Sequence, residues 1–380
     1  EQSIVLLSND GVLPLAHPGR IALVGPNAAS AEALMGCYSF ANHVLAHHPD
    51  VPIGFEIPTL ADALGETFAA SRIDLVAGCE VEGDDRSGFA TAEEAVRAAD
   101  VAVVAVGDRA GLFGRGTVGE GNDVDSLELP GVQRELVERL IATGTPVVLV
   151  VLSGRPYAID WALEPGASGA AAVLQAFFPG EGGRALASVI AGAVSPSGRL
   201  PVSLPRSAGA QPYTYLHPFL GGPNEITSAD SSPALPFGHG LSYTTFVREE
   251  LTVPETVDAG GHFTASVRVS NTGERAGADV VQLYARDVYA SVTRPVAQLV
   301  AFARVELEPG ASATVRFDVP TTRLAFTGLA GQRIVEPGTV ELWVGPACNT
   351  RETETRIEIL GSVHRVTSAD ERLVGVDIIR

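Results

Sequence analysis

Hydrophobic positions in the first half of the chain fall into short unbroken runs separated by amphipathic stretches. The runs lie at residues 21–24, 101–106, 146–152 and 170–178. A run that is apolar at every position predicts a strand buried on both faces, as in a parallel sheet covered by helices. The amphipathic stretches predict helices at residues 60–68, 91–99, 132–143 and 182–191. This alternation predicts an α/β sandwich domain, with a mostly parallel sheet, over residues 20–205.

Beyond residue 205 the pattern changes to short segments in which apolar and polar positions alternate. A connector rich in Pro, Gly, Ser and Tyr occupies residues 206–245. Alternating segments bounded by turn signals follow at residues 262–269, 280–285, 296–305, 313–319 and 340–344. Strands of this length and spacing predict an all-β sandwich of the fibronectin type III or immunoglobulin kind over residues 246–361. Residues 362–380 are expected to form a C-terminal tail.

Composition narrows the classes of function. The chain has 380 residues, 46% of them hydrophobic, which is enough to bury two or three cores. Its formal net charge of -19 repels phosphate backbones and anionic lipids, so we expect no nucleic acid and no membrane as partner. The chain contains arginine but no lysine, which excludes Schiff-base chemistry and a P-loop lysine. Cys37, Cys79 and Cys348 have no paired spacing, so neither a disulfide framework nor a zinc site is expected.

One glycine-rich stretch stands apart from the rest of the first half. Residues 107–123 follow a buried run, and the carboxyl end of a parallel strand is where α/β folds place ligands. One interpretation is a mobile surface loop with solvated charges. A phosphate cradle around Gly114-Arg115-Gly116 is a second, although neither GxGxxG nor GxxxxGK is present. Composition alone does not separate these interpretations from a catalytic loop.

The motifs in and after this stretch resemble those of glycoside hydrolase family 3. The string EGND at 120–123, followed by LELPGVQ at 127–133, resembles the acid/base loop of that family, commonly E-G-x-D-R and then L-x-L-P-G-x-Q. Further family-like strings occur in order: SIVLLSNDGVLPL at 3–15, GCY at 36–38, FFPGEGG at 177–183, PSGRLP at 196–201 and PFGHGLSYTTF at 236–246. The collinear set spans essentially the whole chain.

The resemblance implies part of a retaining, exo-acting β-glycosidase, a β-glucosidase or β-xylosidase that hydrolyses terminal non-reducing β-linked sugars. Such enzymes use two carboxyl groups about 5–5.5 Å apart. In the family the nucleophilic aspartate lies on an N-terminal barrel, in a segment resembling S/T-D-W, to which Asp160-Trp161 is only a partial match. The chain also begins in mid-pattern without an initiator methionine, so residues 1–19 are expected to be the linker from a missing barrel. We expect the chain alone to be inactive.

The resemblance assigns Glu120 as the general acid/base, with no cofactor and no metal. Asp123 matches the family's aspartate, but Val124 stands where an arginine is usual, so Asp123 is expected to fix loop shape rather than to react. Tyr38 is expected to line the aglycone side of the pocket, or else to be a half-buried aromatic residue of a turn. Arg115 contacts substrate or orients the loop in one interpretation and is solvated in the other.

A runner-up hypothesis from another class is a non-catalytic module that binds carbohydrate or supports assembly. The projecting loop with Glu120 favours the enzyme, whereas the absent nucleophile favours the module. A nucleotide-binding α/β protein is disfavoured by the missing phosphate motifs and the charge of -19. The expected partners are a β-linked oligosaccharide or glycoside and the barrel, and a homo-oligomer is compatible with the sequence. The sequence does not define glucose against xylose preference, the compartment or the oligomeric state.

Overall fold

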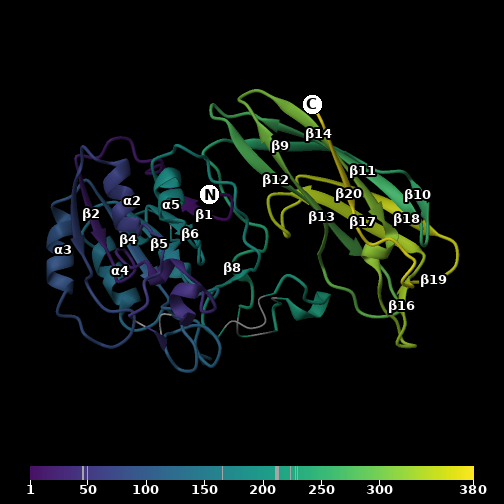
Figure 1. Cartoon of the computed structure of the whole chain (residues 1–380). Helices are drawn as coiled ribbons and strands as arrows, with labels where there is room; N and C mark the ends of the chain where they lie inside the picture. The colour runs from purple at the N-terminus through teal and green to yellow at the C-terminus, as the bar shows by residue number, and fades with distance from the viewer. Residues whose placement is uncertain are drawn as a thin grey trace. The chain divides into compact units, whose positions relative to one another are not determined.

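The computed structural model describes two compact units, the first α/β and the second all-β (Figure 1). It describes residues 1–44, 47–48, 50–164, 166–209, 214–222, 224–226, 228 and 230–380. The first unit comprises Glu1–Gly198 and Leu204–Gln211, and the second comprises Arg199–Ser203 and Pro212–Arg380. Among the described residues no helix is both long and apolar enough to cross a membrane.

The first unit is built on a six-stranded sheet in the order β1-β6-β5-β4-β2-β3. Its strands are β1 (Val5–Asn9), β2 (Arg20–Val24), β3 (Arg72–Val76), β4 (Val101–Gly107), β5 (Val147–Leu152) and β6 (Ala172–Gln175). All neighbours are parallel except β1, which runs antiparallel to β6. Every residue of β4, β5 and β6 is buried, as the apolar runs predict, so the mostly parallel sheet is confirmed.

Two strands of this sheet do not come from the runs at 21–24, 101–106, 146–152 and 170–178. β3 is an edge strand whose residues are only half-buried or exposed, and Arg72 and Asp74 interrupt its apolar positions. β1 forms the opposite edge and lies within residues 1–19, the segment expected to be a linker. The sheet therefore begins earlier in the chain than the pattern indicated.

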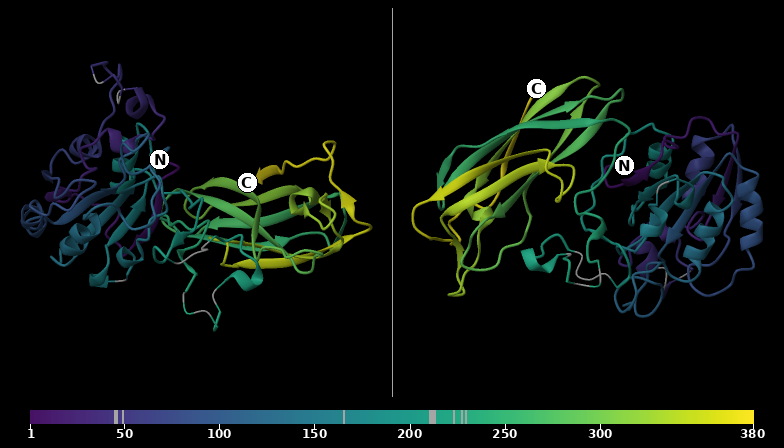
Figure 2. Two further views of the ribbon diagram at one scale, coloured as in Figure 1. Left: turned by 90° about the horizontal axis from the view of Figure 1, so that it is seen from below. Right: turned by 180° about the vertical axis from the view of Figure 1, so that it is seen from behind.

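Helices cover both faces of the sheet. They are α2 (Leu60–Thr67), α3 (Phe89–Arg97), α4 (Gln133–Ile141) and α5 (Gly183–Ile190), with short helical turns η1 (Glu32–Leu34), η2 (Phe40–Val44), η3 (Asp160–Ala162) and η4 (Gly166–Ser168). The connection from β2 to β3, which contains α2, runs in one direction along the sheet. The connections from β3 to β4 and from β4 to β5, which contain α3 and α4, run in the other direction. Because such crossovers are right-handed, α2 lies on one face of the sheet and α3 and α4 lie on the other. Accordingly, α2 contacts α5 and α3 contacts α4 (Figures 1 and 2). The α/β sandwich is confirmed.

The second unit contains two sheets that face each other across one core. The first, in the order β10-β18-β17-β12-β13, consists of β10 (Thr256–Asp258), β18 (Thr353–Leu360), β17 (Gly338–Gly345), β12 (Gly277–Asp287) and β13 (Gln298–Leu307). The second, in the order β20-β14-β11-β9, consists of β20 (Gly375–Ile379), β14 (Ser312–Pro320), β11 (His262–Asn271) and β9 (Phe246–Thr252). The all-β sandwich is confirmed.

Smaller elements complete the chain. A three-stranded sheet is formed by β15 (Phe326–Thr327), β16 (Arg333–Val335) and β19 (His364–Arg365). The remaining elements are β7 (Leu204–Pro205) in the first unit, and β8 (Pro233–Leu235), η5 (Phe219–Gly221) and η6 (Thr321–Leu324) in the second. Residues 362–380, expected to be a tail, contain β19 and the edge strand β20.

The core of the sandwich follows from the period of two in its strands. Along β11, Phe263, Ala265, Val267 and Val269 are buried, while the residues between them face away from the core. The side chains that β12, β13, β14, β17 and β18 turn inward belong to the same cluster. Strand alternation alone therefore places the hydrophobic core between the two sheets.

A buried ion cluster lies at the end of this core. Asp279 on β12 has no exposed surface, and Arg248 on β9 donates to both of its carboxylate oxygens, at 2.7 and 2.6 Å. Arg199 donates to the same carboxylate at 3.0 Å, and Arg248 also contacts Glu352 at 3.0 Å. Burial lowers the pKa of Arg199. A bidentate pair with a second guanidinium can offset the desolvation of Asp279 only while all partners are present.

We expect Asp279→Asn to destabilise the second unit by about 3–5 kcal/mol, because two buried guanidinium groups would then face a neutral amide. Denaturant unfolding followed by tyrosine and tryptophan fluorescence measures this loss. Glu306→Gln is the matched control, because its ion pair with Arg304 is on the surface and should contribute less than about 1 kcal/mol. Equal effects of the two variants would contradict this account of the cluster.

Candidate functional site

The candidate site lies where the sheet of the first unit reverses its winding direction. Strands β2 and β4 are neighbours, but the chain leaves β2 towards β3 and leaves β4 towards β5, on opposite sides. In such sheets the carboxyl ends of the two diverging strands form the crevice that binds ligands. The two long segments that leave these strands are 25–59 and 108–132, and they carry Tyr38 and Glu120 respectively.

A buried carboxylate forms the base of the site. Asp108 directly follows β4 and has no exposed surface. It accepts hydrogen bonds from the Thr117 hydroxyl at 2.7 Å, from the Gly154 amide at 2.9 Å and from the Tyr157 hydroxyl. Burial, and then the charge of Asp108, raise the pKa of Tyr157, so this phenol stays a donor. Asp108 therefore joins the loop after β4 to the segment after β5.

Arg155 forms the next layer of this support. Its guanidinium lies 3.9 Å from Asp108 and donates to the backbone carbonyl oxygens of Thr117 and Asn122. Asn122 is itself buried, and its amide donates to the carbonyl oxygen of Gly111 at 3.1 Å. The loop between Asp108 and Asn122 is thus held by a hydrogen bond between two of its own residues and by Arg155 from the segment after β5.

Gln133, the last residue of the LELPGVQ string, has a structural role in the site. Its side chain is fully buried at the start of α4, accepts from the Gly107 amide at 2.8 Å and donates to the Gly107 carbonyl oxygen at 2.9 Å. The same amide nitrogen contacts the carbonyl oxygens of Val81, at 3.0 Å, and Pro130, at 3.2 Å. Gln133 therefore holds together the two ends of the segment that carries Glu120.

Glu120 itself is exposed at the outer end of this loop. It follows Gly119, where φ is +125° and a Cβ would lie 1.9 Å from the Gly111 carbonyl oxygen, so only glycine fits. The Tyr38 hydroxyl donates to Glu120 Oε2. This hydrogen bond, with smaller contributions from desolvation and from the Glu120 charge, raises the pKa of Tyr38. The structure thus brings Tyr38 and Glu120 together although 82 positions separate them.

The other two residues expected in the site are placed differently. Asp123 is exposed, and among the described residues its side chain has no hydrogen bond or ion pair. Arg115 is also exposed and lies on the side of the loop that faces a separate cavity. Neither side chain is in the contact between Tyr38 and Glu120. Arg109, at the start of the loop, pairs with Glu82 at 2.6 Å.

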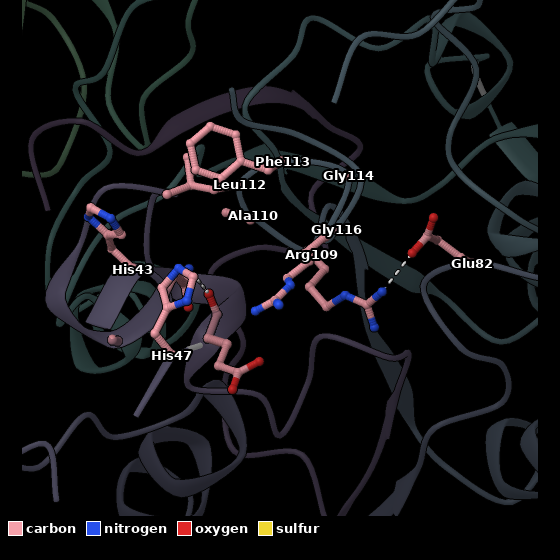
Figure 3. Close-up of a pocket in the computed structure, with 14 residues that line it drawn as sticks. His43, His47, Glu82, Arg109, Ala110, Leu112, Phe113, Gly114 and Gly116 are labelled. Atoms are coloured by element: carbon pink, nitrogen blue, oxygen red, sulfur yellow. Dashed lines mark hydrogen bonds and ion pairs between the residues drawn. The ribbon is translucent and has the colours of Figure 1, made fainter. Parts of the chain in front are cut away.

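The cavity of about 670 Å³ lies beside the loop and is lined by Arg109, Arg115 and the apolar and glycine residues between them (Figure 3). Residues from the segment after β2 also line it, including His43 and His47, whose rings lie 6.3 Å apart. The His43 ring also contacts the Tyr38 ring edge-on at 5.9 Å. Within the described part of the chain, no group of three or more His, Cys, Asp or Glu side chains could hold a metal ion.

Asp108, Asn122, Gln133, Arg155 and Tyr157 were not singled out by the sequence. Asp108 and Ser153-Gly154-Arg155 each follow a buried strand, β4 and β5, and these strands are adjacent. Because the carboxyl ends of adjacent parallel strands meet at one edge, this placement was an available signal for their proximity. Asn122 gave no such signal, since its burial depends on loop closure.

Comparison with known proteins gives a consistent set of relatives. The model "Glycosyl hydrolase family 3 C-terminal domain" matches residues 4–243, and "Fibronectin type III-like domain" matches residues 279–348. A beta-xylosidase of Formosa agariphila is 36% identical over 93% of this chain and 48% of its own length. A periplasmic beta-glucosidase of Salmonella typhimurium is 38% identical over 90% of this chain and 47% of its own length.

Solved structures agree with these matches. A beta-glucosidase from Listeria innocua in complex with isofagomine has a TM-score of 0.81 and 29% identity over 94% of this chain and 49% of that chain. A β-glucosidase from Erythrobacter marinus has a TM-score of 0.80 and 34% identity over the same shares. The chain spans about half the length of these relatives.

We expect Arg155→Ala to loosen the loop without unfolding the unit, because the loop carbonyl oxygens lose their donor. Amide hydrogen exchange of residues 109–123 should become at least about tenfold faster, a change of about 1.4 kcal/mol in local opening. Arg109→Ala is the matched control, since that guanidinium pairs only with exposed Glu82 among the described residues. Exchange equally slow in Arg155→Ala and wild type would show that Arg155 does not anchor the loop.

The contact between Tyr38 and Glu120 predicts an effect on tyrosine ionisation. Glu120→Gln removes the carboxylate that accepts from Tyr38 and opposes the phenolate charge, so the pKa of Tyr38 should fall. Ultraviolet titration of each protein, minus the same protein carrying Tyr38→Phe, isolates this one residue. Glu82→Gln, which removes an exposed carboxylate near the same loop, should leave the Tyr38 titration unchanged. A Tyr38 titration unaffected by Glu120→Gln would place the two side chains apart in solution.

Proposed function

The chain belongs to glycoside hydrolase family 3, and we propose that it supplies the general acid/base, Glu120, of a retaining exo-acting β-glycosidase. The substrate would be a terminal non-reducing β-linked glucoside or xyloside, the two sugars named in the relatives' descriptions. The nucleophilic aspartate and most of the sugar pocket would come from a barrel domain, a partner outside these residues.

One observation carries the proposal. Glu120 is exposed, yet its loop is fastened at the sheet's switch point by Asp108, Arg155 and Gln133. A mobile surface loop would need no buried carboxylate or buried amide beneath it, because both are costly unless their hydrogen bonds are made. Holding one exposed carboxyl group in place is instead what acid/base catalysis requires.

The proposed mechanism divides the work between two carboxyl groups. In the first step, the nucleophile on the barrel attacks the anomeric carbon while the Glu120 carboxyl gives its proton to the glycosidic oxygen as that bond breaks. In the second step, the Glu120 carboxylate takes a proton from water, which attacks the same carbon and releases the nucleophile. Desolvation by a bound sugar and a nearby carboxylate would favour the protonated form needed in the first step.

Three neighbours have proposed supporting roles. The Tyr38 hydroxyl, which donates to Glu120 Oε2, would fix the rotamer of the carboxyl group, and its ring would line the aglycone side. Arg115 would reach a bound glycoside from the cavity side of the loop. Asp123, exposed directly after Asn122, would approach substrate or barrel.

The decisive experiment uses aryl β-glucosides and aryl β-xylosides with the chain alone and mixed with a separately produced barrel domain. We expect no turnover by the chain alone, and turnover by the mixture that Glu120→Ala lowers by about 10²–10⁴-fold. The loss should be smaller for aglycones that are good leaving groups, because these depart without a proton. This dependence on the leaving group distinguishes a general acid from a residue that only binds.

Glu128→Gln is the matched control, since Glu128 lies in the same motif but pairs with Arg134 at 3.1 Å on the surface. It should retain the activity of the mixture. Turnover by the chain alone at a comparable rate would place a nucleophile within these residues and overturn the proposal. A mixture that binds sugar but hydrolyses nothing with any aglycone would favour the non-catalytic carbohydrate-binding or assembly module.

A further inference from the structure

The second unit contains a row of aromatic rings outside its main hydrophobic core. Tyr215 stacks on Phe237 at 4.2 Å, Phe237 meets Tyr284 edge-on at 6.5 Å, and Tyr284 stacks on Trp343 at 5.7 Å. Phe237 belongs to the PFGHGLSYTTF string. The next residue, Gly238, has φ +87°, and a Cβ there would lie 2.5 Å from the Tyr284 hydroxyl, so only glycine lets this string approach the row.

A cavity of about 410 Å³ opens beside one end of the row, a size in the range of small-molecule sites. Tyr215, Trp343 and Phe219 contribute aromatic surface to its lining. Its polar lining consists of neutral side chains, such as Ser203 and Asn349, and of the guanidinium groups of Arg286 and Arg351. No carboxylate is among the described residues that line it, although the chain as a whole has a net charge of -19. The cavity is therefore an aromatic pocket with cationic side chains in an acidic protein.

The two arginines of the lining are fixed in place by aromatic rings and by one shared carboxylate. The Arg351 guanidinium lies 4.2 Å from the centre of the Trp343 ring, and the Arg286 guanidinium lies 5.8 Å from that of Phe219. Glu341 is 3.3 Å from Arg351 and 3.9 Å from Arg286. Glu341 also pairs with Arg356 at 3.0 Å, and Glu354 pairs with Arg351 at 2.9 Å. Three guanidinium groups thus share two carboxylates, which leaves positive charge in excess.

Trp343 is the most deeply buried aromatic residue of the lining. Its side chain is 1% exposed, and its indole Nε1–H has no hydrogen-bond acceptor among the described residues. Leaving a buried donor unpaired is unfavourable, and such atoms are rare in folded proteins. Trp343 therefore contributes ring surface, and not its Nε1–H, to the lining of the cavity.

We propose that this cavity binds a small organic anion that carries a carboxylate on a ring. The carboxylate would accept from Arg286 and Arg351, a charge-assisted geometry that guanidinium groups favour. The ring would lie against the aromatic lining, as sugar rings and aromatic rings both do. Hexuronic acids and aromatic carboxylic acids share this chemistry. The cavity belongs to the second unit, so the proposal goes beyond the hydrolytic function and does not depend on Glu120.

The test uses the intrinsic fluorescence of Trp343, because the chain has 2 tryptophans and Trp161→Phe leaves this one as reporter. The probes are glucuronate and 4-hydroxybenzoate, each with its neutral counterpart, glucose and 4-hydroxybenzyl alcohol. We expect saturable binding of at least one anion, with a Kd of roughly 1 μM to 1 mM, weakened by salt. The neutral counterparts should bind at least about tenfold more weakly. Titration calorimetry on the unmodified chain repeats the measurement without the reporter.

Arg286→Gln and Arg351→Gln should each weaken binding by about tenfold or more. Arg356→Gln is the matched control, since Arg356 pairs with the same Glu341 but does not line the cavity, and it should bind like wild type. Binding of glucuronate alone would identify a sugar acid, and binding of 4-hydroxybenzoate alone an aromatic acid. Two outcomes overturn the proposal: no saturable binding of either anion, or equal losses in Arg356→Gln and the two lining variants. Hydrolysis by the mixture with a barrel remains a separate readout.

Discussion

The buried carboxylate of Asp108 is the constraint on which the candidate site of the first unit depends. A carboxylate without exposed surface is stable only if its lone pairs are satisfied, and here Thr117, Gly154 and Tyr157 satisfy them. These donors come from two different segments, after β4 and after β5, so neither can move without leaving the charge unpaired. The sheet itself thereby fixes the position of a loop that has no regular secondary structure. The closed conformation of residues 108–122 follows from this single requirement.

The proposed chemistry uses the fixed loop in a particular way. The anchors lie at its base, whereas Glu120 and Tyr38 meet at its exposed end. Rigid support below and solvent above allow a second domain to approach the carboxyl group without distorting it. In the second unit, too, a buried carboxylate holds together segments that are distant in sequence. Asp279 holds Arg199 and Arg248 at the end of the core, so that the segment 199–203 is tied to the sandwich.

Local pattern predicted those parts of the molecule in which burial is continuous or strictly alternating. β4 and β5 are buried at every position and were visible as apolar runs, whereas β3, with Arg72 and Asp74 at an exposed edge, was not. Glu120 was identified through motif resemblance, not through any physical property of its neighbours in sequence. The contact between Tyr38 and Glu120 depends on strand order, which places β2 beside β4, and no local pattern encodes strand order. The position of Arg155 after β5 was a signal for its proximity to Asp108, but its contacts and those of Asn122 are made to backbone carbonyl oxygens, and no residue type in the loop indicates such contacts.

Because the loop is held through backbone atoms, some of its side chains are free to vary. Arg155 donates to the carbonyl oxygens of Thr117 and Asn122, and Asn122 donates to that of Gly111. These hydrogen bonds do not depend on which side chains the accepting residues carry. The exposed side chains of Phe113 and Arg115 can therefore change while the scaffold below keeps its shape, whereas Gly116 must stay glycine because its φ is +98° and a Cβ would lie 2.4 Å from the Arg109 carbonyl oxygen. The part of the cavity wall formed by these two side chains can thus be altered by substitution without changing the backbone of the loop. Hydrogen bonds to the main chain thus separate the shape of the loop from the contour of the cavity wall.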